Sequence, residues 1–159
     1  MCERKACAIA YIKKHHPEVE HLFKDFMSMV KGECKCEICG FIHGIGNLGM
    51  CTCATIGLPC QPFVSLRDAE AGGIRTSSPE KHPDYVTVNE GTFAYALLRQ
   101  PKIIVIEEVC DMLRLMKSST AGVTYLYKLL CQLAQAGYET TVLKLDHNIW
   151  VEMNRKRIA

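Results

Sequence analysis

The sequence predicts a single α/β domain, and three stretches of the 159-residue chain support that prediction. The run at 101–106, Pro-Lys-Ile-Ile-Val-Ile, is typical of a strand buried on both faces in a parallel sheet. Cys51–Ile56 alternates small and β-branched residues, which indicates a second short buried strand. Apolar residues at helical spacing predict an amphipathic helix over Ala121–Ala136, with Gly137 as its terminator.

The remaining elements follow from stop signals and periodicity. An apolar stripe predicts a helix over Glu3–His16, which Pro17 ends. Asn89 can cap a helix that runs to about residue 100, and Tyr138–Leu145 is predicted to be a strand. Residues 64–88 hold many glycines, serines and prolines and predict a long loop, which in a compact domain is usually functional or disordered.

Composition narrows the class of protein. The chain is 48% hydrophobic and 23% charged, as soluble globular proteins are. No apolar run approaches the length of about 20 residues that a bilayer requires, and no signal-peptide core follows the charged start. We therefore expect an intracellular protein with no membrane partner. The net charge of +2 does not by itself indicate a polyanionic partner, and the basic cluster at 155–157 is either a solvated tail or a contact site.

Ten cysteines in such a chain indicate reduced thiols or metal ligands. Six candidate ligands cluster between positions 34 and 53: Cys34, Cys36, Cys39, His43, Cys51 and Cys53. Cys36 and Cys39 have the CxxC spacing of tetrahedral zinc sites, but Cys51 and Cys53 have only one residue between them and do not repeat that spacing. We expect small thiols packed in a core and no metal, with zinc as the alternative.

Gly44–Gly49 reads Gly-Ile-Gly-Asn-Leu-Gly, which matches the glycine pattern of dinucleotide-binding loops. No convincing strand precedes it, and the segment that follows is predicted to be extended instead of helical. We therefore interpret it as a flexible loop.

Cys60 is the residue most directly presented for chemistry. It stands between Pro59 and Pro62 at the end of a predicted strand, and two prolines make the chain leave the sheet as a rigid loop. A cysteine held there is a candidate nucleophile, provided that its surroundings favour the thiolate. The alternative is a strand-end turn that contains a cysteine by chance.

Glu107 and Glu108 follow the clearest predicted strand. Open α/β sheets hold their ligands at the carboxyl ends of the strands, so these acids are candidate site residues. Two adjacent acids are also expected to raise one another's pKa. The alternative is a solvated strand end.

The segment Pro-Cys-Gln-Pro-Phe at 59–63 resembles the catalytic loop of the DNA cytosine-5 methyltransferases. Four further landmarks resemble family segments in the same order: Cys2-Glu3, His21–Phe26, Glu107–Val109 and Met153–Arg157. The resemblance implies a Rossmann-like, S-adenosylmethionine-dependent methyltransferase fold that is incomplete at both ends. Residues 1–159 would then be part of a catalytic domain without its target-recognition domain.

The resemblance also implies the role of each site residue. Cys60 would attack carbon 6 of cytosine, Glu107 would hold N3 and the exocyclic amine, and Arg155 and Arg157 would steady the base carbonyl and nearby phosphates. The cofactor-binding set would be Glu3 for the ribose diol, Asp25 for adenine, Phe26 against the adenine ring, and Pro59.

This chain departs from the family pattern at four positions. Glu108 replaces the asparagine that braces the Pro-Cys loop, and Met153 replaces a glutamine. Trp150 and Glu152 stand where the family prefers glycine and proline.

The function implied is methyl transfer from S-adenosylmethionine to carbon 5 of cytosine in DNA, with the target base flipped out of the duplex. Such a protein would be nuclear if its source is eukaryotic, and a longer chain could supply the missing segments. Three alternatives remain open: a transfer RNA methyltransferase, an inactive methyltransferase-like binding module or gene fragment, and a zinc-dependent interaction domain at 34–53.

Overall fold

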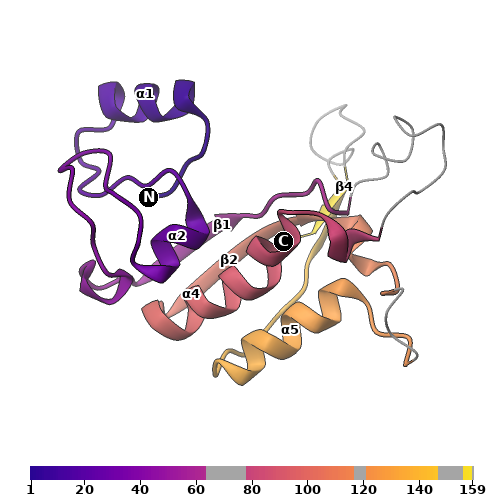
Figure 1. Cartoon of the computed structure of the whole chain (residues 1–159). Coiled ribbons are helices and arrows are strands. Elements are labelled where there is room, and N and C mark those ends of the chain that lie inside the picture. Colours follow the sequence, from indigo (N-terminus) through magenta and orange to yellow (C-terminus); the bar gives the residue numbers. More distant parts are fainter. Residues whose placement is uncertain (64–77, 117–120, 147–155, 159) are drawn as a thin grey trace.

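The computed structural model describes residues 1–63, 78–116, 121–146 and 156–158 (Figure 1). Within these ranges the α-helices are α1 (Ala6–His15), α2 (Phe26–Lys31), α4 (Thr92–Arg99) and α5 (Tyr125–Gln135). The strands are β1 (Cys53–Gly57), β2 (Ile103–Val109), β3 (Lys144–Asp146) and β4 (Lys156–Ile158). The mixed α/β class is therefore confirmed. No helix among the described residues is both long and apolar enough to cross a membrane.

The sheet is built on the parallel pair β1 and β2, with α4 between them in the chain. The pairing runs in register from Cys53 opposite Ile103 to Gly57 opposite Glu107. β4 pairs antiparallel with the end of β2, and β3 pairs antiparallel with β4, giving the order β1-β2-β4-β3. Both strands predicted from the sequence are present, each beginning two residues later than expected.

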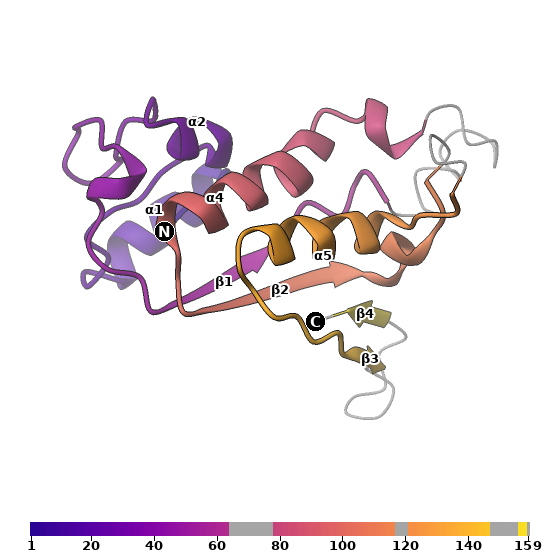
Figure 2. The same cartoon turned by 90° about the horizontal axis from the view of Figure 1, so that it is seen from below.

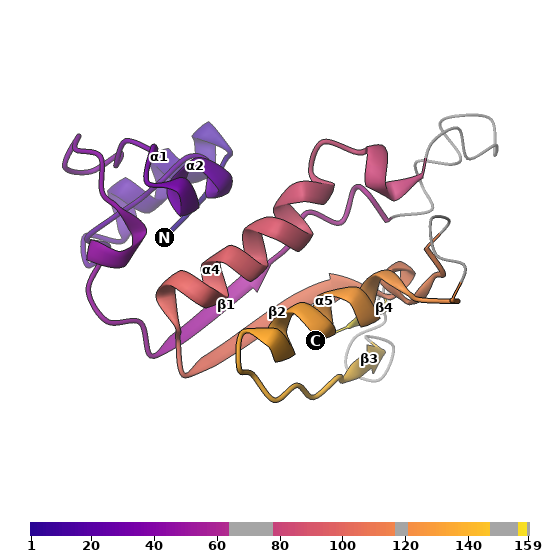
Figure 3. The same ribbon diagram turned by 60° about the horizontal axis from the view of Figure 1, so that its bottom comes forward.

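Helices α4 and α5 lie side by side over one face of the β1–β2 pair (Figures 2 and 3). Ile104 and Ile106 pack against the core beneath these helices. Its buried members are Leu58, Phe63, Tyr85, Val88, Ala96, Met112, Tyr125, Leu129 and Leu133. On the other face, Ile103 and Val105 are 56% and 45% exposed. The expectation that this strand is buried on both faces is therefore wrong, because both helices lie on one face.

Two predicted helices are confirmed with shorter bounds. α1 begins at Ala6, because Glu3 belongs to an extended segment before it. α5 begins after Thr124, whose side chain caps the helix by accepting a hydrogen bond from the Tyr127 N–H at 3.0 Å. As predicted, Gly137 terminates α5: it directly follows the C-cap Ala136 and adopts the left-handed conformation with φ of 90°.

Asn89 does not cap a helix, contrary to the sequence prediction. It lies inside a π-helical turn, η3 (Thr87–Gly91), that leads directly into α4. Its buried side-chain amide donates to the carbonyl of Tyr85 at 3.3 Å. The predicted loop is thus partly helical from Pro79 onward, and residues 64–77 lie outside the described residues.

The strand predicted over Tyr138–Leu145 is also wrong for most of its length, because only β3 is extended and paired. The Tyr138 N–H instead closes the end of α5 by donating to the carbonyl of Leu133 at 3.0 Å. Its hydroxyl donates to the carbonyl of Pro101 at 2.7 Å. These two bonds tie the start of the predicted strand to the helix side of the sheet.

Residues 1–49 form a small unit beside the sheet, which we call the N-terminal lobe (Figure 1). Its core consists of Phe23, Met29, Val30, Cys34, Cys36 and Ile45. The lobe packs closely on the turn before α4. A Cβ placed on Gly91 would lie 2.5 Å from Met27 Sδ and 3.1 Å from the Phe26 ring, so glycine permits this approach.

We predict that Phe63→Ala lowers the free energy of unfolding by about 3–5 kcal/mol. The Phe63 ring is 1% exposed and packs 5.3 Å from the Tyr125 ring and 6.2 Å from the Tyr85 ring, measured between centroids. Urea denaturation followed by circular dichroism measures the change. Phe41→Ala is the matched control, because that ring is 71% exposed, and it should change stability by less than about 0.5 kcal/mol. Equal effects of the two substitutions would contradict the placement of Phe63.

Candidate functional site at the carboxyl ends of β1 and β2

The carboxyl ends of β1 and β2 lie side by side, as the sequence prediction requires. Gly57 pairs with Glu107, and the Leu58 N–H donates to the Glu107 carbonyl at 3.3 Å. The Glu107 side chain leans over β1, because its Oε2 atom lies 3.8 Å from the position that a Cβ on Gly57 would take. Side chains alternate along a strand, so Glu107 lies on the same face as Ile103 and Val105, where it is half-buried and its Oε1 atom is shielded from solvent.

Cys60 lies three residues after Gly57, in the loop that leaves β1 directly after this pair. Its far end is anchored, because Pro62 and Phe63 are buried and the Phe63 N–H donates to the Cys60 carbonyl at 2.9 Å. Cys60 itself is half-buried and carries a free thiol. The loop therefore holds Cys60 between the end of β1 and a fixed aromatic anchor, so the cysteine is restrained without being sealed in the core.

Glu108 points the opposite way from Glu107, into the core beneath α4 and α5. It is 4% exposed, and its Oε2 accepts a hydrogen bond from the Val109 N–H at 2.7 Å. Burial raises the pKa of Glu108 to about 8, and the Val109 bond offsets only part of that effect. The sequence prediction attributed a raised pKa to the neighbouring acid; the cause is desolvation instead.

At neutral pH the Glu108 side chain is thus mainly a neutral carboxylic acid. Like the amide of asparagine, such a group has a hydrogen-bond donor. Its Oε1 atom is buried and has no hydrogen-bond partner within the part of the chain that the structure describes.

Of the two arginines that the resemblance assigns to the site, only Arg157 lies among the described residues. Arg157 lies in β4, where its backbone pairs with Val109 on one side and Leu145 on the other. The strand that carries it therefore runs beside the end of β2, two residues beyond Glu107. Arg155 lies outside the described residues, as do Trp150, Glu152 and Met153.

The predicted cofactor residues Glu3 and Asp25 lie in the N-terminal lobe. Cys2 and Phe23 form a parallel bridge, and the Glu3 N–H donates to the Phe23 carbonyl at 2.9 Å. Glu3 and Asp25 thus follow two extended segments that run side by side. Each carboxylate also has a local partner: Glu3 accepts from the Lys5 N–H at 2.8 Å, and Asp25 caps α2 by accepting from the Ser28 N–H at 2.7 Å.

Phe26 and Pro59 complete the predicted cofactor set. Phe26 is half-buried at the start of α2, and its ring centroid lies 5.7 Å from that of Tyr95 in α4. It therefore packs between the lobe and α4. Pro59 is half-buried at the start of the Cys60 loop.

The glycine-rich segment at 44–49 does not form a phosphate cradle. It contains the short 3-10 helix η1 (Ile45–Asn47), and its carbonyls face the guanidinium of Arg99, which donates to Ile45 at 3.0 Å and also to Leu48 and Gly49. A phosphate would need N–H groups in that direction. A cavity of about 440 Å³ beside this segment opens at the amino ends of β1 and β2, away from Cys60.

The cysteine cluster predicted at 34–53 divides in the structure. Cys36, Cys39 and His43 converge with His21, and one ligand atom from each lies within 4.8 Å of the others. Cys34, Cys51 and Cys53 are not part of this group. All ten cysteines lie in the described residues, and each is a free thiol. Sequence reasoning missed His21, which lies 15 positions before the CxxC pair.

Within the His21–His43 group the side chains already contact one another. Cys39 Sγ lies 2.9 Å from His43 Nε2, and Cys36 Sγ lies 3.9 Å from His21 Nδ1. Burial raises the pKa of the Cys36 thiol, but hydrogen bonds from the backbone around Cys39, Leu22 and Ile38, and from His21, outweigh it and lower the pKa to about 6.

The sequence matches no protein-family model and no curated protein. Function must therefore be argued from the site itself.

We predict that Glu108→Gln raises the free energy of unfolding relative to the wild type, by an amount that grows with pH. Between the ordinary value of 4.5 and the raised value of about 8, the folded protein keeps a proton that the unfolded chain releases. Wild-type stability therefore falls as pH rises through that window, and glutamine removes this loss. The difference should reach a few kcal/mol, on the order expected for a pKa shift of this size.

Urea denaturation at several pH values between 5 and 8.5 measures this difference. Glu139→Gln, which removes an exposed carboxyl, is the control and should follow the wild-type curve. A Glu108→Gln effect that does not change with pH would contradict the assigned burial of the acid.

Proposed function

We propose that this chain is part of the catalytic domain of a cytosine-5 methyltransferase, with Cys60 as its nucleophile and DNA as its substrate. The observation that carries the proposal is the register of β1 and β2. It sets the Cys60 loop and the Glu107 carboxylate at adjacent strand ends, on one edge of a parallel pair. This is the edge where α/β sheets hold their ligands.

The chemistry needs both residues. Carbon 5 of cytosine is a weak nucleophile, so the Cys60 thiolate would first add to carbon 6 and push the ring electrons toward carbon 5. Glu107, in contact with N3 and the exocyclic amine, would stabilise the charge that this addition places on the ring. Loss of the carbon 5 proton after methylation would then expel the thiolate and restore the double bond.

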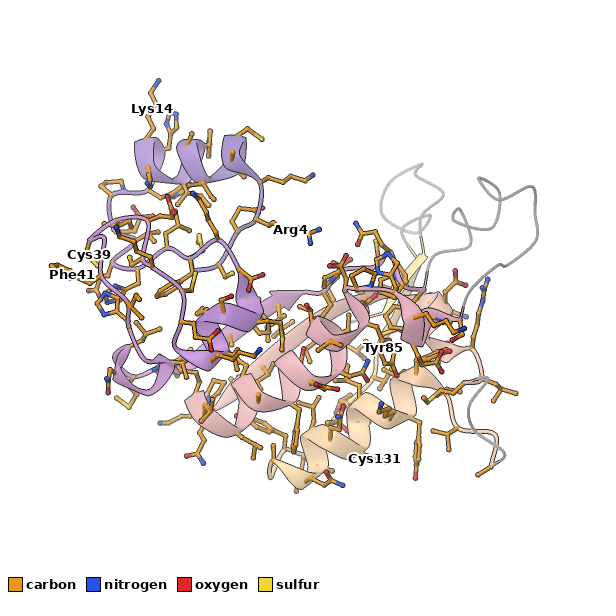
Figure 4. All side chains as sticks on the ribbon, viewed as in Figure 1. Arg4, Lys14, Cys39, Phe41, Tyr85 and Cys131 are labelled. Atoms are coloured by element: carbon orange, nitrogen blue, oxygen red, sulfur yellow. The ribbon has the colours of Figure 1, made fainter. Side chains whose placement is uncertain are left out.

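S-adenosylmethionine would supply an electrophilic methyl group, and the lobe offers residues that fit it in part. Glu3 and Asp25 follow two parallel extended segments, an arrangement suited to a ribose diol and an adenine in a Rossmann-like fold. Side-chain contacts also connect this part of the lobe to the Cys60 loop. Arg4 Nη1 lies 3.0 Å from Asp84 Oδ1, and Tyr85 packs on Phe63. Figure 4 labels Arg4 and Tyr85.

Duplex DNA is the favoured substrate because it is the substrate of the family that the Pro-Cys-Gln loop resembles. A base in a duplex would have to be flipped out to reach Cys60. Transfer RNA offers the same cytosine ring to the same chemistry, so it remains the alternative substrate.

An inactive methyltransferase-like binding module is the second candidate, and Glu108 favours it. The buried acid stands where the resembled family places the amide that braces the Pro-Cys loop. Loss of that brace would leave the Cys60 thiol misplaced for attack while the fold is kept.

We predict a covalent adduct between Cys60 and DNA that contains 5-fluorocytosine, when S-adenosylmethionine is present. Fluorine at carbon 5 cannot leave as a proton does, so the thioether at carbon 6 persists through a denaturing gel. Cys60→Ser should abolish the adduct. Cys110→Ser is the matched control, since Cys110 is half-buried directly after β2, and it should retain the adduct.

The outcomes separate the candidates. An adduct that survives in Cys60→Ser contradicts the nucleophile. No adduct from a folded wild-type chain that binds both S-adenosylmethionine and DNA favours the inactive module. A parallel reaction with transfer RNA carrying 5-fluorocytidine identifies the nucleic acid.

We also predict that Glu3→Gln weakens S-adenosylmethionine binding about tenfold, or ~1.4 kcal/mol, because a charged acceptor for the ribose diol becomes neutral. Isothermal titration calorimetry measures the dissociation constant. Glu20→Gln, at an exposed position of the same lobe, is the control and should bind as the wild type does. Equal affinities in Glu3→Gln and the wild type would contradict the assigned role of Glu3.

A further inference from the structure

Four potential metal ligands meet in the N-terminal lobe, outside the proposed catalytic site. They are His21, Cys36, Cys39 and His43, and one ligand atom from each lies within 4.8 Å of the others. The ring centroids of the two histidines are 4.5 Å apart. Two sulfurs and two ring nitrogens therefore surround one small volume.

The backbone, more than side-chain flexibility, produces this convergence. The CxxC turn is closed by the Gly40 N–H, which donates to the Cys36 carbonyl at 3.0 Å, and by the Cys36 N–H, which donates to the Phe41 carbonyl at 2.8 Å. Gly40 has φ of 78°, a left-handed conformation that favours glycine. The Ile38 N–H also points at Cys36 Sγ, 3.4 Å away, where it would stabilise a thiolate.

Two further backbone pairings bring the histidines to this turn. An antiparallel bridge between Lys35 and Ile42 returns the chain so that His43 faces Cys39. The Glu37 N–H donates to the Leu22 carbonyl at 2.7 Å, which fixes the turn against the residue that follows His21. Segments 15 or more positions apart in the sequence are thus held in place without a metal contact.

The two sulfur and two nitrogen ligand atoms indicate which metal ion would bind. Tetrahedral sites with two sulfurs and two nitrogens suit zinc, with Zn–S distances of about 2.3 Å and Zn–N distances of about 2.0–2.1 Å. Those bond lengths place ligand atoms roughly 3.3–3.8 Å from one another in a tetrahedron. Metal binding would draw the widest pair together by about 1 Å and separate Cys39 Sγ from His43 Nε2 slightly.

We propose that His21, Cys36, Cys39 and His43 bind one zinc ion, and that this site is structural. Four protein ligands fill a tetrahedral shell and leave no position for water or substrate, which distinguishes structural from catalytic zinc. This proposal departs from the sequence-based expectation of no metal, and its ligand set differs from the one considered from the sequence by including His21. It does not depend on the proposed methyltransferase activity.

Because the lobe is small, a zinc ion would contribute to its stability. Its core has six buried members, and its described helices are α1, α2 and η1. Units this small rarely bury enough apolar surface to fold firmly without a disulfide or a metal. The zinc ion would fix the turn at 36–43 to the segment that contains Phe23, and so hold the parallel bridge between Phe23 and Cys2.

The first test measures metal content. The full chain, prepared without a histidine tag and kept reduced, is loaded with zinc and dialysed, and zinc per chain is measured by mass spectrometry. We expect about one ion per chain. Replacement by cobalt should give the intense d–d bands of a tetrahedral site and a thiolate charge-transfer band. A folded chain that binds no zinc, or cobalt spectra without thiolate ligation, would overturn the proposal.

The second test uses matched cysteine variants. Cys39 and Cys53 are both exposed, but only Cys39, which Figure 4 labels, belongs to the group. Cys39→Ser should weaken zinc binding by a factor on the order of 100 or more, measured by competition with a chromophoric chelator. Cys53→Ser should bind as the wild type does. Unchanged affinity in Cys39→Ser, or an equal loss in Cys53→Ser, would contradict the assigned ligands.

Discussion

The pairing register of β1 and β2 is the constraint on which the rest of the structure depends. Side chains alternate between the two faces of a strand, so the register decides which of two adjacent acids reaches the open face. With Gly57 opposite Glu107, the Glu107 side chain leans over β1 and Glu108 enters the core. A slip of one residue would exchange the two, burying the proposed catalytic acid.

The same register fixes the point at which the Cys60 loop begins. The loop leaves β1 directly after the pair with Glu107, and Phe63 returns it to the aromatic cluster with Tyr85 and Tyr125. α4 and α5 both lie on one face of the β1–β2 pair (Figure 3). The face that the helices cover holds the core, and the opposite face carries the half-buried Glu107 carboxylate.

The N-terminal lobe has its own hydrophobic core, separate from the core beneath α4 and α5. Its core is small, and the proposed zinc ligands, the bridge between Cys2 and Phe23, and the close packing at Gly91 all restrain the same segments. Zinc binding and methyl transfer are separate proposals. Both concern the lobe segments that carry Glu3 and Asp25, because the zinc ligands would help to hold these segments in place.

Much of the fold could be predicted because the signals are local. The β-branched run of β2, the proline-flanked Cys60 and the apolar stripe of α5 each identify their element without distant partners. The placement of Glu107 beside the end of β1 was also predictable, because parallel strands end at one edge of a sheet.

What could not be predicted depends on tertiary contacts. Ile103 and Val105 are exposed because both helices pack on the opposite face of the sheet. The composition of a strand does not reveal on which face the helices pack. Asn89 has the sequence of a cap, but its amide bonds to Tyr85 inside a π-turn. His21 joins the CxxC turn through a fold-back that no sequence spacing identifies.

Interstrand nuclear Overhauser effects in an isotopically labelled sample test the central claim most directly. The structure predicts a parallel pattern in which Thr55 lies opposite Val105 and Gly57 opposite Glu107. A pattern shifted by one residue, or an antiparallel one, would turn Glu107 away from the end of β1 and contradict the proposed site.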